Sequence, residues 1–97
     1  MIHFEAGCMR PAGAVTLQNV AAVMKEGLVH VAAGAHTLDL SAVSALDSSL
    51  IAATLSWIRA ARAAGRTLAI TQMPQGMRVM AELYGVTELL GAPSLSH

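Results

Sequence analysis

Apolar residues recur at two different periods along the chain, and these periods predict alternating strands and helices. Near the start, Ile2 and Phe4 alternate with His3 and Glu5, which is the two-residue period of a strand with one buried face. A second extended segment, residues 8–11, follows a glycine turn, and a proline and a glycine then interrupt the pattern. The chain is therefore expected to open with two short strands.

Helical spacing replaces this alternation in the next part of the chain. Thr16 is an N-cap residue type and Gly34 is a typical helix stop, so a first helix is predicted between them. Its apolar residues recur at three- and four-residue intervals: Leu17, Val20, Val23 or Met24, and Leu28. Residues 36–40 then form a short apolar run, which is typical of a strand inside a sheet covered on both faces.

Two further helices with a strand between them are predicted in the second half. One helix begins at Asp47-Ser48-Ser49 and ends at Gly65. A short buried strand follows at residues 67–71. Pro74 then opens a third helix, which Gly85 terminates.

The resulting order of elements is β-β-α-β-α-β-α. Alternation of this kind predicts one α/β domain over residues 1–97, with a small, mostly parallel sheet flanked by helices. Residues 86–90 are expected to pack on this domain, and the tail beyond them is expected to fray.

Composition narrows the class of protein. Hydrophobic residues make up 55% of the chain and charged residues 12%, which excludes disorder. Six basic residues balance six acidic ones, so no net charge attracts nucleic acid or an anionic membrane. The single cysteine, Cys8, cannot form an internal disulfide, which fits a reducing cytosol. The apolar run at residues 50–61 is too short and too polar to insert into a membrane.

The second helix has two distinct faces when its residues are spaced by about 100° each. One face is expected to pack on the sheet through Leu50, Ile51, Thr54, Trp57, Ile58 and Ala61. The opposite stripe carries Ser48, Ala52, Arg59, Ala63 and Arg66, with Leu55 and Arg62 beside it. Small residues let a partner backbone approach closely, and arginine is enriched at interfaces. The stripe is therefore predicted to be a docking face.

The third helix is expected to extend this face. Val79 and Leu83 are assigned to the core, which leaves Met77 and Tyr84 at the edge next to the partner. Met80 stays divided between core and interface, because methionine suits both environments. The predicted partner-binding residues are Ser48, Ala52, Leu55, Arg59, Met77 and Tyr84.

A purely structural interpretation of the same residues remains open. Aspartate and serine are preferred N-cap residues, worth about 1 kcal/mol each, so the serine hydroxyls are explained by capping alone. Arg59, Arg62 and Arg66 are likewise explained as a solvated face whose charges favour the C-terminal end of the helix.

Three segments of the chain resemble the STAS domain, the family of anti-sigma-factor antagonists. They read TLDLSAVSALDSS, GRTLAITQMP and AELYGVTELL, and the resemblance extends over residues 13–90. Within the family the chain is most similar to the MlaB-type subunits. The resemblance implies a non-catalytic cytoplasmic accessory subunit, held at the inner membrane by a phospholipid-transporting Mla-type ABC transporter that maintains outer-membrane lipid asymmetry. The implied partner is the MlaF-like ATPase subunit of that transporter.

The resemblance also assigns roles to the two serines. Ser49 occupies the place of the serine that a partner kinase phosphorylates in the antagonists, and Ser48 occupies the place of the hydroxyl that contacts the ATPase in MlaB-type proteins. The antagonists follow the serines with glycine, but Leu50 stands here, which disfavours close approach of a kinase. The alternative function is an anti-sigma-factor antagonist, with an anti-sigma factor kinase as partner and Ser49 or Ser48 as the phosphorylated residue.

An enzyme is the third class, and the residues give it little support. No histidine lies near the serines in the sequence, and the four histidines, His3, His30, His36 and His97, lack metal-ligand spacing. The glycines do not form a phosphate-cradling loop. We therefore expect no catalysis, no metal and no cofactor, and any nucleotide should lie on the partner.

Overall fold

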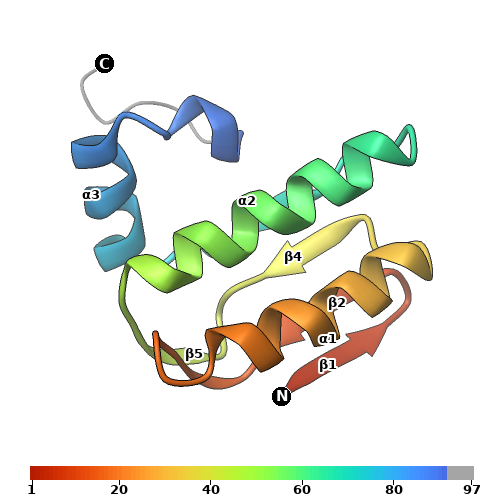
Figure 1. The fold of residues 1–97 in the computed structure, drawn as a ribbon, viewed down its shortest axis with the longest axis horizontal. Helices are drawn as coiled ribbons and strands as arrows, with labels where there is room; N and C mark the ends of the chain where they lie inside the picture. The colour runs from red at the N-terminus through yellow and green to blue at the C-terminus, as the bar shows by residue number, and fades with distance from the viewer. Residues whose placement is uncertain (92–97) are drawn as a thin grey trace.

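The structure, a computed structural model, describes residues 1–91 (Figure 1). Its strands are β1 (Ile2–Glu5), β2 (Cys8–Pro11), β3 (Gly13–Val15), β4 (Thr37–Asp39), β5 (Val43–Leu46) and β6 (Ala69–Thr71). Its helices are α1 (Val20–Ala32), α2 (Ser48–Ala63), α3 (Gln75–Tyr84) and the short 3₁₀ helix η1 (Glu88–Leu90). The expected fraying of the tail concerns residues 92–97, which lie outside the described residues.

The main sheet has four strands in the order β1-β2-β4-β6. β1 and β2 form an antiparallel hairpin, whereas β2, β4 and β6 run parallel to one another. The prediction of an α/β fold with a small, mostly parallel sheet flanked by helices is therefore confirmed.

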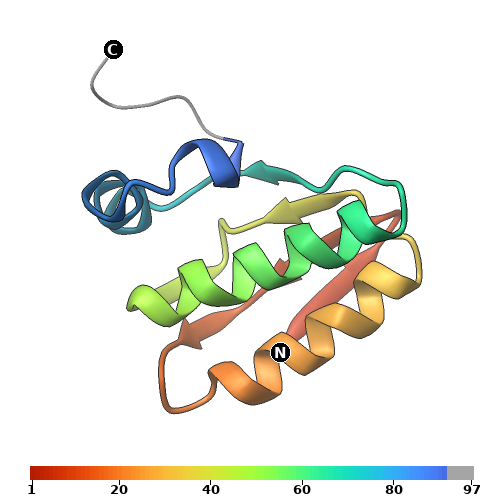
Figure 2. The same cartoon turned by 45° about the horizontal axis from the view of Figure 1, so that its top comes forward.

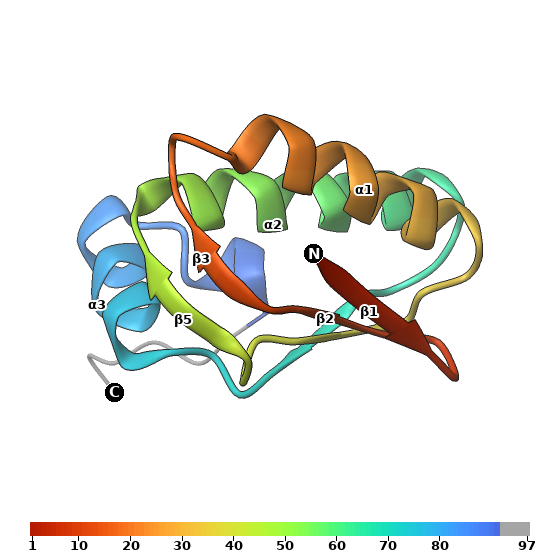
Figure 3. The same ribbon diagram turned by 90° about the horizontal axis from the view of Figure 1, so that it is seen from below.

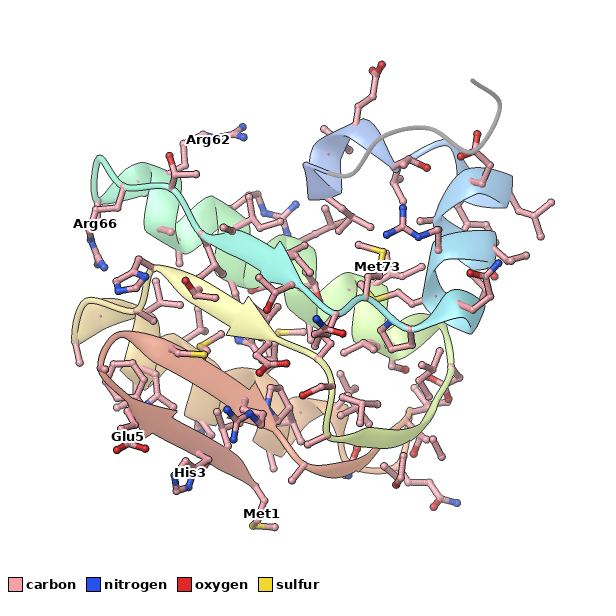
Figure 4. The ribbon with its side chains drawn as sticks, turned by 180° about the vertical axis from the view of Figure 1, so that it is seen from behind. Met1, His3, Glu5, Arg62, Arg66 and Met73 are labelled. Atoms are coloured by element: carbon pink, nitrogen blue, oxygen red, sulfur yellow. The ribbon has the colours of Figure 1, made fainter. Side chains whose placement is uncertain are left out.

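The two long helices, α1 and α2, lie side by side on one face of this sheet (Figures 2 and 3). Met9 and Leu38 point into that side and are fully buried, whereas Arg10 and Asp39 on the same strands form an ion pair of 3.1 Å on the other. Within residues 1–91, no helix stands in front of that other face (Figure 4). The expectation of a sheet covered on both faces at residues 36–40 is therefore wrong. Successive side chains of this short strand point to opposite faces, and only one of these faces is covered by helices.

Sequence periodicity missed two strands, β3 and β5. They pair with each other in parallel to form a separate two-stranded sheet. Each is short and rich in small or exposed residues, so neither shows an apolar alternation. The pairing joins segments about thirty residues apart, and a local pattern does not reveal it.

The first helix begins later than predicted, at Val20, and its N-cap is Asn19 instead of Thr16. Residues 16–19 form a turn, in which the Asn19 amide donates to the Thr16 carbonyl at 3.0 Å. Leu17 is consequently 78% exposed and does not belong to the core. A polar side chain at Asn19 that bonds its neighbouring backbone favours this turn over another helical turn.

The third helix has the predicted bounds but the opposite buried face. Pro74 precedes it and Gly85 ends it in the left-handed conformation, at φ +70°. Met77 and Ala81 are fully buried, whereas Val79 is 42% and Leu83 77% exposed. The assignment of Val79 and Leu83 to the core is wrong, and so is the placement of Met77 on the surface. Met77 and Ala81 are apolar and four residues apart, and so are Val79 and Leu83. Helical periodicity alone therefore did not distinguish the buried pair from the exposed one.

The helix layer is held together where Trp57 of α2 packs on α1. The Trp57 side chain is fully buried, and its indole N–H donates to the Met24 carbonyl at 2.9 Å. A Cβ placed on Gly27 would lie 2.3 Å from the indole ring, so α1 carries a glycine at the point of contact. The close approach of the two helices requires both residues.

We predict that Gly27→Ala destabilises the protein by about 1–3 kcal/mol, because the added methyl overlaps Trp57 and forces the helices apart. This loss outweighs the gain of up to about 1 kcal/mol that alanine normally brings to a helix. Chemical denaturation of both proteins measures the difference.

Gly76→Ala is the matched control, since a Cβ at Gly76 of α3 meets no atom within 4 Å. It should leave stability unchanged or raise it by up to about 1 kcal/mol. Equal effects of the two substitutions would show that the contact with Trp57 does not limit the helix spacing.

Candidate partner-binding site

The site is built around the carboxylate of Asp47, which is the N-cap of α2. Its Oδ1 accepts a hydrogen bond from the Ser49 amide at 2.8 Å. Its Oδ2 accepts one from the Leu17 amide at 3.0 Å. One side chain therefore joins the start of α2 to the turn before α1. The helix is capped by Asp47, and the interpretation of the serine hydroxyls as its caps is wrong.

These hydrogen bonds also determine the charge of the group. The amide of Leu17, followed by the amide and hydroxyl of Ser49, holds the pKa of the Asp47 carboxyl below its ordinary value of 3.8. Asp47 is consequently ionised at neutral pH, and its negative charge lies at the positive end of the α2 dipole.

The two serines that follow have different surroundings. Ser48 is the first residue of α2 and is exposed. Ser49 is half-buried, and its backbone amide donates to the Asp47 carboxylate. Leu50 is fully buried in the core. Its side chain therefore does not cover the serines from outside, contrary to the steric role expected of it.

Leu17 is a surface residue that the sequence reasoning missed. It projects from a turn braced by Asn19, whose Oδ1 accepts from the Thr16 amide at 3.0 Å and whose Nδ2 donates to the Ala14 carbonyl at 2.8 Å. The bond to Asp47 brings this turn next to Ser48. The Thr-x-x-Asn pattern before the helix was the signal for a turn at this point.

The stripe predicted along α2 is present in part. Ser48, Ala52 and Arg59 are exposed on it, but Leu55 is half-buried and packs against the core. Arg66 follows the helix and donates to the carbonyls of Val31 at 2.6 Å and Ala35 at 3.3 Å. Arg66 therefore closes the C-terminal end of α1 and is not available to a partner.

The third helix contributes less than predicted to a site at Ser48. Met77 is fully buried and cannot contact a partner directly, so its assignment as a binding residue is corrected. Tyr84 is 57% exposed, but it ends α3 about 13 Å along the helix axis from Gln75. Figure 1 shows α3 running away from the start of α2. The structure thus separates Tyr84 from Ser48.

Within residues 1–91, no group of three or more His, Cys, Asp or Glu side chains is arranged to hold a metal ion. In the same part of the chain, no helix is long and apolar enough to cross a bilayer.

Comparison with known proteins defines the class to which this fold and site belong. The family model described as "Mlab, STAS domain" matches residues 2–91. The chain therefore belongs to the STAS-domain family and is MlaB-like. No curated protein matches the sequence significantly.

A solved structure with a similar fold is that of the anti-sigma factor antagonist SpoIIAA in its unphosphorylated form. The two structures superpose with a TM-score of 0.63 at 17% sequence identity. The match covers 82% of this chain and 78% of that chain. At this identity the likeness establishes the fold.

We predict that Asp47→Ala lowers the melting temperature at pH 7, and that this loss shrinks below about pH 4. The folded-state pKa of Asp47 is lowered, so its stabilisation is present above the unfolded value of 3.8 and disappears as the pH falls through the folded value. Thermal unfolding at pH 7 and pH 3 measures both effects.

Glu5→Ala is the control, because Glu5 is an exposed carboxylate on β1 that takes no part in this cap. A loss for Asp47→Ala that is the same at both pH values would show that the ionised cap does not stabilise the fold.

Proposed function

We propose that this protein is a non-catalytic accessory subunit that binds the ATPase of a phospholipid-transporting, Mla-type ABC transporter. It would lie in the cytoplasm, held at the inner membrane by the transporter complex. Transport and ATP hydrolysis would belong to other subunits, and the pathway served would be the maintenance of outer-membrane lipid asymmetry.

The observation that carries this proposal is the different exposure of the two serines. Ser48, whose position the family resemblance associates with the ATPase contact, is free at the surface beside Leu17. Ser49, whose position it associates with phosphorylation, is half-buried, and its amide donates to Asp47. Together with the MlaB-type family model, this favours a constitutive docking site over a phosphorylation switch.

The docking site would be the surface formed by Leu17, Ser48 and Ala52. The braced turn fixes the backbone at Leu17, so little backbone entropy is lost when a partner covers it. The small side chains of Ser48 and Ala52 allow the partner backbone to approach α2 closely. To regulate transport, this surface must bind one conformational state of the ATPase more tightly than another. A subunit with equal affinity for both states would not shift the equilibrium between them.

The second candidate function is an anti-sigma-factor antagonist. The burial of Leu50 supports it, because the leucine side chain packs in the core and does not cover the exposed Ser48. A phosphate on Ser48 or Ser49 would add about 1.5 to 2 negative charges next to Asp47 and disrupt the docking surface.

Gentle purification of the tagged protein from its native host, followed by mass spectrometry, separates the two functions. Co-purification of an ABC ATPase with unmodified serines is the result expected here. Recovery of an anti-sigma factor kinase, or phosphate on Ser48 or Ser49, would instead establish the antagonist.

We predict that Ala52→Tyr weakens binding to the co-expressed Mla-type ATPase at least tenfold without changing the melting temperature. The tyrosine would project from the exposed face of α2 and keep the partner backbone at a distance. Leu17→Asp should have a similar effect, because it places a charge where the partner covers an apolar side chain. Isothermal titration calorimetry with the purified ATPase measures both.

Ala32→Tyr on α1 is the matched control, since Ala32 is also an exposed helical alanine but ends α1, about 18 Å along the helix axis from Val20. It should bind as the wild-type protein does. Undiminished binding by both Ala52→Tyr and Leu17→Asp would remove the proposed docking surface.

A further inference from the structure

The far end of α2 carries two arginines that the fold does not use. Arg59 and Arg62 are both exposed, and within residues 1–91 no carboxylate lies at ion-pair distance from either guanidinium. Two other arginines behave differently. Arg66 is occupied by two carbonyls, and Arg10 pairs with Asp39 across the open face of the sheet.

A hollow of about 180 Å³ lies beside Arg62, between the end of α2 and η1. Ile58, Leu68 and Leu90 give it apolar walls, and Arg62 and Glu88 lie among its polar lining residues. Leu89 also lines it and is 56% exposed. Its volume is of the order of a cavity of roughly 150 Å³ that holds a benzene ring, so one large apolar side chain would fill it.

Figure 4 shows the Arg62 side chain extending away from Arg66 at this end of the molecule. Arg62 thus lines a hollow of mixed polar and apolar character, which Arg66 and Glu88 also line, and Arg59 lies one helical turn before it on α2. Arginine binds carboxylates through two parallel hydrogen bonds, which are stronger than bonds between neutral groups. The two arginines have the chemistry to bind acidic side chains.

We propose that this basic end of α2 binds an acidic segment of the transporter ATPase. One apolar side chain of the segment enters the hollow, and neighbouring carboxylates pair with Arg59 and Arg62. The formal net charge of the chain is zero, so the attraction is local to these residues and is not a property of the whole protein.

This inference rests on the proposed function and adds a second contact to it. Arg59 lies about 16 Å along α2 from Ser48, because eleven residues separate them at a rise of about 1.5 Å each. The two contacts would therefore touch different parts of the ATPase. A partner that reaches both is held in one orientation along α2.

The test is the affinity of the co-expressed Mla-type ATPase for Arg59→Glu and Arg62→Glu, measured by calorimetry at low and high NaCl. We expect each variant to bind at least fivefold more weakly than wild type at 50 mM NaCl. We also expect the difference to shrink at 500 mM, because salt screens exposed charges. Unchanged melting temperatures would confirm that the fold is intact.

Lys25→Glu on α1 is the matched control, because it makes the same change in net charge at an exposed position on another helix. It should bind like the wild-type protein. Wild-type binding that neither arginine substitution weakens would overturn the acidic contact and leave the proposed function standing. Absence of binding by the wild-type protein itself would overturn both.

Discussion

The contact between Trp57 and Gly27 is the constraint on which the rest of the molecule depends. The indole lies against the backbone of α1 and donates to the Met24 carbonyl at 2.9 Å, so it determines how closely the two helices approach. Both helices then cover the same face of the sheet, and no helix of the described residues covers the other face. Packing this tight leaves each helix with only one outward side, and on α2 that side carries Ser48, Ala52 and Arg59.

Asp47 connects this core to the surface. Its carboxylate caps α2 and also holds the turn that presents Leu17, so the exposed leucine and the exposed serine are positioned by one group. The three side chains that follow Asp47 have different roles. Ser48 faces outward, Ser49 supports the carboxylate, and Leu50 anchors the helix in the core. A stable helix start and an exposed hydroxyl are therefore compatible in adjacent residues.

The candidate site was predictable where a local rule applied. The strand-to-helix junction at Asp47 and the outward face of α2 followed from capping chemistry and helical periodicity, which depend on neighbouring residues only. Leu17 and Met77 were misplaced for a common reason. Each is an apolar residue at helical spacing, and spacing does not reveal whether a neighbouring segment covers it.

The sequence by itself determined the α/β class, the bounds of α2 and α3 and the stripe of small residues along α2. The signals for these features are the apolar periodicity, the helix N-caps and the glycines that end helices, and each depends only on residues close together in the sequence. Only the tertiary structure decided which side of α3 is buried, that β3 pairs with β5, and that Arg66 closes α1 while Arg62 stays free. These outcomes depend on contacts between segments distant along the chain. Such contacts depend on how the whole domain packs, so a local sequence pattern does not predict them.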